Sequence, residues 1–188
     1  MTKKTFFAIF LFGISGAVAA HSGGASSGAI HNNILQIAER ILERPDLSSI
    51  EAVASELGIS VSTQALTNAI DSDNKLVGKT QKFSFLDSRY ISLGFKQEDF
   101  SAGTFVPVDA SYIRAWISIS VDSTVCPLKK TLLLSTFENV RIGMMYDATP
   151  PVYYLEEAEG EQNEKVAGFE FAENDCLKRL GFSQNMQK

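Results

Sequence analysis

The sequence predicts an α+β protein in which helices precede a mainly antiparallel sheet. Apolar residues recur about every 3.6 positions between residues 28 and 70, and every second position in segments between residues 80 and 172. Helices and strands that occupy separate stretches of a chain are typical of α+β folds, whereas alternating segments indicate α/β. We expect a helical hairpin or three short helices packed on the sheet, and a short C-terminal helix tied to it by a disulfide.

Residues 1–20 have the composition of a cleavable signal peptide. Two lysines precede an apolar run that extends to Val18, and the small residues after Gly16 suit a signal peptidase. The alternative is a retained membrane anchor, but the run is shorter than the roughly 20 residues that a spanning helix needs. We predict cleavage after Ala19 or Ala20 and a periplasmic or secreted protein without a stable membrane anchor.

The segment after the signal peptide is predicted to be a leader followed by helices. Residues 21–27 are rich in Gly and Ser and are expected to be flexible, and residues 28–188 form a single domain. An apolar stripe predicts a first helix that Pro45 ends, because the residue before a proline is disfavoured in helical conformation. A second helix follows a capping box at 48–51 and ends at Gly58. A third is expected from Val61 to Ile70.

Residues 49–70 also resemble a DNA-binding helix-turn-helix segment. The helix that would read the bases needs basic or amide side chains, and this segment offers Gln64 and Asn68 but no Lys or Arg between Val61 and Ile70. Of the 17 basic residues of the chain, two lie in residues 1–20, which leaves 15 against 22 acidic residues and a net charge of −7. We therefore expect a helical hairpin and no nucleic-acid partner.

The strand region is predicted from alternating apolar residues. The clearest pattern is Tyr112–Val121, in which every second residue from Ile113 is apolar. The other expected strands are 81–86 and 89–95, joined as a hairpin by Asp87-Ser88, then 131–136, 152–155 and 166–171. A helix over about 173–180, stopped by Gly181, is expected to end the domain.

The chain has two cysteines, Cys126 and Cys176. In an oxidising compartment an even pair is most simply interpreted as one disulfide. The alternative is a pair of catalytic thiols, but there is no CxxC spacing and no nearby histidine to activate either sulfur. We predict a disulfide that joins the C-terminal helix to the end of the main strand.

The sequence predicts no catalytic, metal or cofactor site. Motifs such as GxSxG and HExxH do not occur, and both histidines, His21 and His31, lie in the leader or the first helix. The calcium-loop-like start at Asp71 fails because Lys75 occupies a ligand position and Leu76 replaces the turn glycine. A secreted hydrolase would have to use His31 with acids such as Glu98 and Asp99.

Two surfaces are candidates for binding. One is the outward face of the main strand, with Tyr112, Arg114 and the chain's one tryptophan, Trp116, because these residue types dominate interface energies. The alternative is that a helix covers this face and Trp116 belongs to the core. The second surface follows Tyr153 and Tyr154 and is acidic, with Glu156, Glu157 and Glu159; it is either a solvated loop or a site for a basic partner.

Our leading hypothesis is an exported, noncatalytic protein that binds another protein, as an inhibitor or immunity protein does in a bacterial periplasm. The partner is expected to have a basic surface. The alternative is a carrier of small molecules or lipids, with a cavity between sheet and helices. That cavity would be lined by Phe83, Phe85, Phe95, Phe105 and Trp116.

Overall fold

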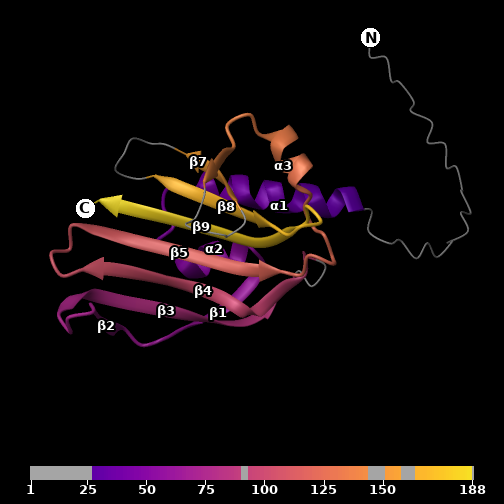
Figure 1. Ribbon diagram of the computed structural model, residues 1–188. Helices are drawn as coiled ribbons and strands as arrows, with labels where there is room; N and C mark the ends of the chain where they lie inside the picture. Colours follow the sequence, from indigo (N-terminus) through magenta and orange to yellow (C-terminus); the bar gives the residue numbers. More distant parts are fainter. Residues whose placement is uncertain (1–26, 90–92, 144–150, 158–163, 188) are drawn as a thin grey trace, which may run out of the picture.

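The computed structural model describes residues 27–89, 93–143, 151–157 and 164–187 (Figure 1). The predicted signal peptide and almost all of the leader lie outside these residues. The helices are α1 (Ser27–Leu42), α2 (Ile50–Glu56) and α3 (Lys130–Thr136). The strands are β1 (Ile59–Thr63), β2 (Thr67–Ile70), β3 (Leu76–Ser88), β4 (Phe95–Pro107), β5 (Tyr112–Val121), β6 (Arg141–Gly143), β7 (Val152–Glu157), β8 (Lys165–Phe171) and β9 (Leu177–Gln187).

The strands of the described residues form one antiparallel sheet, so the predicted α+β class is confirmed. Its order is β1-β3-β4-β5-β9-β8-β7-β6, and β2 pairs with β3 beside β1. The last strand, β9, therefore lies in the centre between β5 and β8 (Figure 1). This arrangement places strands from the two halves of the chain on either side of β9.

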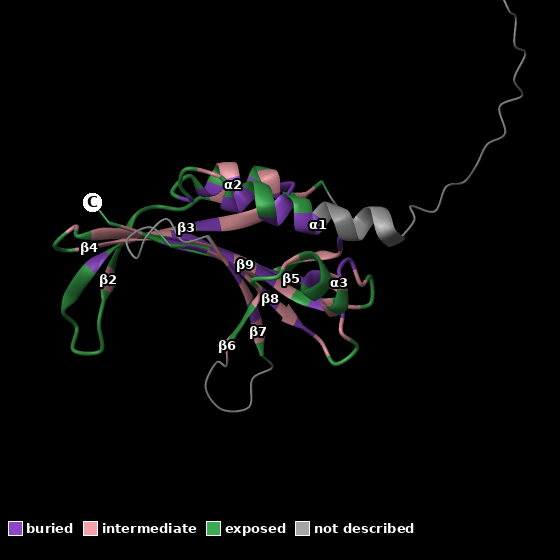
Figure 2. Ribbon diagram, turned by 90° about the horizontal axis from the view of Figure 1, so that it is seen from above, coloured by how far each residue is buried: buried purple, intermediate pink, exposed green. Residues whose placement is uncertain are grey.

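The helices α1 and α2 cover one face of the sheet. Figure 2 shows both helices on the same side, while β2 and β6 curve away from them. The described residues of the stripe predicted for the first helix, from Ile34 to Leu42, are buried, as are the stripe residues of the second. They pack against apolar side chains of the sheet such as Ile117, Ile119, Phe169 and Phe182. None of the helices in the described part of the chain is long and apolar enough to span a membrane.

The predicted third helix, Val61–Ile70, is wrong: this segment forms parts of β1 and all of β2. Ile59, Val61 and Thr63 alternate with two serines, and β-branched side chains favour a strand over a helix. The helix-turn-helix resemblance therefore has no structural counterpart. The capping box is also wrong, because Ser49 precedes α2 without a side-chain cap and the Ser48 hydroxyl binds Asp46.

Three further predictions about the sheet region are wrong. Residues 81–86 are in a strand as predicted, but this strand, β3, runs through the predicted turn at Asp87-Ser88 and pairs with β4, so the predicted hairpin with a strand at 89–95 is wrong. Residues 131–136 form α3, because a run of leucines fits a helix as well as a strand. The C-terminal helix is replaced by β9, in which Leu180, Phe182 and Gln184 are buried at every second position.

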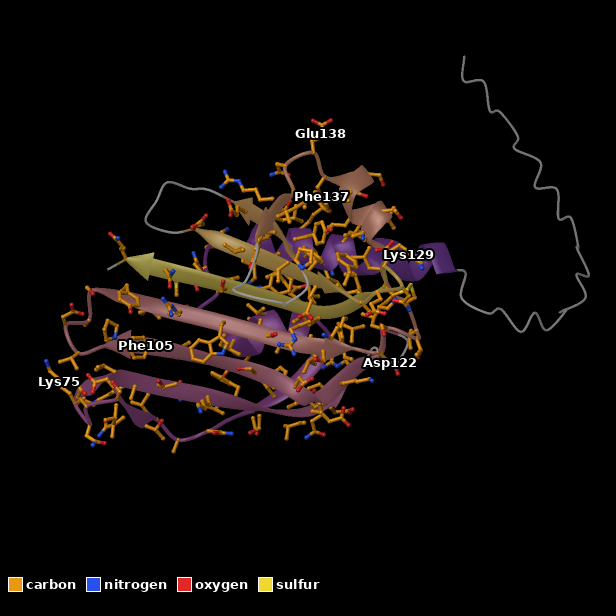
Figure 3. All side chains as sticks on the ribbon, viewed as in Figure 1. Lys75, Phe105, Asp122, Lys129, Phe137 and Glu138 are labelled. Atoms are coloured by element: carbon orange, nitrogen blue, oxygen red, sulfur yellow. A yellow bond between two sulfur atoms is a disulfide. The ribbon has the colours of Figure 1, made fainter. Side chains whose placement is uncertain are left out.

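The predicted disulfide is confirmed. Cys126 and Cys176 are bonded, and they link the segment after β5 to the start of β9. Backbone bonds reinforce this junction: the Leu177 amide donates to the Leu128 carbonyl at 2.9 Å, and the Lys130 amide to the Asp175 carbonyl at 2.9 Å. In Figure 3 the sulfur atoms lie between the labelled Lys129 and Asp122, at the end of the sheet opposite Lys75.

Candidate functional site

The sheet brings residues from both predicted surfaces to its open face, the one opposite α1 and α2. Trp116 on β5 pairs with Ser183 of β9, which pairs with Val166 of β8, which pairs with Glu156 of β7. Directly paired residues of an antiparallel sheet share one face. Tyr154, two residues before Glu156, also lies on this face because side chains alternate along a strand.

A groove crosses this face between Trp116 and Tyr154. Its volume is about 280 Å³, and its lining comes from β5, β7, β8 and β9 alone. The floor is a row of small residues in register: Ser118 pairs with Gly181, and Gly181 pairs with Gly168. Side chains on the neighbouring rows rise above these positions. The groove thus exists because two adjacent strands carry glycine at the same level.

Glycines also fix the two aromatic walls of the groove. A Cβ on Gly103 would lie 2.6 Å from the Trp116 ring, and a Cβ on Gly143 would lie 2.3 Å from the Tyr154 ring. Each ring therefore lies so close to a glycine of the adjoining strand that a Cβ would not fit there. The Trp116 Nε1 donates a hydrogen bond to Ser101 Oγ at 3.1 Å. The indole is held in place and remains half-buried, so the interpretation of Trp116 as a core residue under a helix is wrong.

Ion pairs border the groove. At one end Glu170 accepts a hydrogen bond from Lys178 at 2.7 Å and lies 3.8 Å from Arg179, whose guanidinium is 3.9 Å from Asp99. At the other end Arg141 pairs with Glu156 at 2.7 Å. These partners neutralise the acids that border the groove. The centre of the groove is mainly apolar, with Val152 and Val166 beside the aromatic rings.

The other predicted binding residues lie outside the groove. Tyr153 points to the helical side, where it is buried and its ring packs edge-on against Phe171. Tyr112 packs against Phe105 farther along the open face, and Arg114 donates to Asn185 at 2.9 Å. Glu157 ends β7 in register with Lys165. Glu159 lies outside the described residues.

The glycines of the floor and walls were missed by the sequence analysis. Gly168 and Gly181 interrupt strands whose neighbours are large, and glycine inside a strand often marks a close approach of another group. That signal was present at Gly168, within the predicted strand 166–171. At Gly181 it was interpreted as a helix stop.

The residues named for the carrier alternative are brought together only in part, and the hydrolase arrangement depends on a side chain outside the described residues. Phe83, Phe85 and Trp116 line one pocket of about 350 Å³. Phe95 and Phe105 are not part of its lining, so the five residues proposed for a carrier do not line one cavity. Asp99 accepts a hydrogen bond from Ser120 at 3.0 Å, and the His31 side chain is outside the described part of the structure. Among the described residues there is no cluster of metal-binding side chains.

No protein-family model, curated protein or solved structure matches the chain, so the groove has to be interpreted from its own geometry.

Proposed function

We propose that the protein is an exported, noncatalytic binding domain that holds another protein against the open face of its sheet. The observation that supports this best is the convergence of Trp116 and Tyr154 on one apolar groove. Trp and Tyr are the side chains most enriched at the energetic centres of interfaces, where they pack in desolvated pockets surrounded by polar groups. The groove has this composition, with ion pairs at its ends.

The shape of the groove favours a protein over an enclosed small molecule. It is an open depression across four strands, and the space between sheet and helices is filled by core side chains. A partner would insert one aliphatic or aromatic side chain between Trp116 and Tyr154, above Gly168 and Gly181. The net charge of −7 beyond residue 20 favours a basic partner, because complementary potentials speed association. An inhibitor or immunity-type protein of a bacterial periplasm has these properties.

Filling the groove is expected to abolish partner binding without unfolding the domain. In Gly181→Val the new side chain occupies the floor, and a Cβ there has no neighbour closer than 3.5 Å. Valine also suits a strand better than glycine. Trp116→Ala is expected to weaken the partner roughly thirtyfold, the effect of losing about 2 kcal/mol at an interface centre. The measurement is affinity capture of the mature protein's partner, followed by titration of the identified partner.

Thr80→Val is the matched control for this experiment. Thr80 lies on β3, on the same open face of the sheet, but does not line the groove. It should bind the partner like the wild type. If a stoichiometric protein partner is found and both Gly181→Val and Trp116→Ala bind it as tightly as the wild type does, the proposal is contradicted. A tightly bound lipid with no protein partner would contradict it too and favour the carrier.

Export is expected to remove residues 1–19 or 1–20. The disulfide between Cys126 and Cys176 supports this part of the proposal, because such bonds persist in oxidising compartments. The intact mass of protein recovered from the periplasm or medium should correspond to a chain that begins at Ala20 or His21. A recovered chain that still carries Lys3 and Lys4 would contradict the proposed signal peptide.

A further inference from the structure

A second pocket lies beside Trp116, where the sheet divides. The ladder between β3 and β4 ends at the pair of Phe83 and Ala102. Beyond this pair β3 remains paired with β1 on its other edge. In the same region β4 carries an insertion relative to β5, because residues 97–100 lie opposite the single residue Ile119. Such bulges re-aim side chains and are common next to functional sites.

The pocket in this fork has a volume of about 350 Å³, within the range of small-ligand sites. It differs from the groove in chemistry, because amides, hydroxyls and an ammonium group contribute to its lining. Its polar side chains come from three segments of the chain, and its apolar lining includes Phe100 and Trp116 together with Phe83, Phe85 and Ala102. The polar lining residues are Gln64, Lys82, Ser84, Gln97 and Ser101.

Several of these groups are fixed by contacts within the protein. Gln64 Nε2 donates to Ser84 Oγ at 2.6 Å, and Phe100 packs edge-on against Phe85 with ring centres 5.6 Å apart. Trp116 is held by its hydrogen bond to Ser101. A site whose rings and amide are already positioned loses less freedom when a ligand binds.

Two groups at the edge of the pocket have no such partner. Within the described part of the chain, Lys82 forms no ion pair and Gln97 no hydrogen bond through its side chain, and both are exposed. Among the described residues, no carboxylate lines the pocket. Asp99, from the same bulge, accepts from Ser120 and lies 3.9 Å from Arg179. The pocket therefore offers an ammonium and an amide to a ligand, without a competing acid in its lining.

From this geometry we infer that the pocket binds a saccharide that carries an acidic group. Amides and serine hydroxyls can donate and accept hydrogen bonds, as sugar hydroxyls do. The face of an aromatic ring is partly negative and attracts the C–H groups of a sugar ring. Lys82 would pair with the carboxylate or sulfate of the ligand. This site is separate from the proposed protein-binding groove, although Trp116 borders both.

Trp116 reports binding directly, since it is the chain's one tryptophan. The probes are acidic oligosaccharides built from galacturonic acid, glucuronic acid or sulfated sugars. We expect at least one of them to change the fluorescence of Trp116 saturably. The wild type should bind neutral maltotriose at least roughly tenfold more weakly than the acidic oligosaccharide, because the charged hydrogen bond is absent. For the same reason Lys82→Gln should bind the acidic oligosaccharide at least roughly tenfold more weakly than the wild type does. Gln97→Ala should also weaken binding.

Lys79→Gln is the matched control, because it removes the same charge from the same strand at a residue outside the pocket. It should bind like the wild type. Gly181→Val should also retain the saccharide, so a failure of the groove proposal does not affect this result. The inference would be overturned by the absence of saturable binding to every acidic oligosaccharide, by equal affinity for maltotriose, or by unchanged affinity in Lys82→Gln.

Discussion

Replacing Lys165 with methionine is expected to lower the free energy of unfolding by about 3 kcal/mol, because hydrogen bonds from a charged group contribute roughly 1.5–3 kcal/mol each and two are lost. Lys165 on β8 is only 2% exposed, and its ammonium donates to the carbonyls of Leu42 and Arg44, the latter at 2.6 Å. Leu42 is the last residue of α1, and Arg44 follows two residues later. The last carbonyls of a helix have no backbone N–H partner within the helix and need other donors. A methionine would fill the space but leave both carbonyls without this donor.

The effect is large because Lys165 and Gln184 both attach the α1–α2 connection to the sheet. Gln184 of β9 pairs with Lys165 in register and is buried beside it. Its Oε1 accepts a hydrogen bond from the Leu47 amide at 2.8 Å. Loss of Lys165 therefore loosens the helical layer over the strands that carry the groove on their other face.

Lys178→Met provides the matched control for Lys165→Met. Lys178 lies on the neighbouring strand β9, and its side chain is 50% exposed in an ion pair with Glu170. Exposed pairs of this kind contribute at most about 1 kcal/mol. Urea unfolding of both variants measures the difference, and an equal loss in the two would show that Lys165 does not have the stabilising role assigned to it.

The sequence identified what depends on local patterns. The stripes of α1 and α2, the strand Tyr112–Val121 and the disulfide are present in the structure, because each follows from spacing or residue type within one segment. The expected strands 152–155 and 166–171 also lie within β7 and β8, whereas β4 and β6 were not predicted. These elements establish the α+β class.

The errors arise where a short segment is compatible with two periods. Residues 177–187 contain leucines three apart and a glycine, which fits a short helix as well as a strand. Pairing with β5 and β8 decides for the strand, and that pairing is not visible in the segment itself. The same holds for residues 131–136, which become helical beside the disulfide.

The site could be predicted only in part for the same reason. Trp116 and Tyr154 were candidates by residue type, but their place at one groove follows from β9 lying between β5 and β8. Lys82 and Gln97 gave no signal, because an exposed lysine or glutamine is ordinary in any strand. Their significance comes from the bulge in β4, which the sequence does not reveal.

Removing the disulfide is expected to have the largest effect on stability. The double variant Cys126→Ser/Cys176→Ser should lose about 4 kcal/mol of unfolding free energy, the value that chain entropy assigns to a closed loop of this size. The bond closes a loop with a sequence separation of 50 residues. That loop contains α3, β6, β7 and β8, and therefore one wall and part of the floor of the groove.

Urea unfolding followed by Trp116 fluorescence measures this loss. Wild-type protein treated with a thiol reductant should unfold at the same urea concentration as the double variant, since both lack the same bond. Reductant should not shift the double variant, which serves as the control. A loss below about 1 kcal/mol would contradict the stabilising role, because it falls well short of the loop-closure value.

The disulfide also connects stability to the binding face. Trp116 precedes the loop that the bond closes, Tyr154 and Gly168 lie within it, and Gly181 follows it. Residues of the groove are therefore held in register partly by a bond at the end of the sheet. If the double variant remains folded at low temperature, its partner affinity should fall less than that of Gly181→Val, because the β8–β9 and β5–β9 ladders still align the groove. A larger loss would mean that the bond, and not the ladders, holds the groove together.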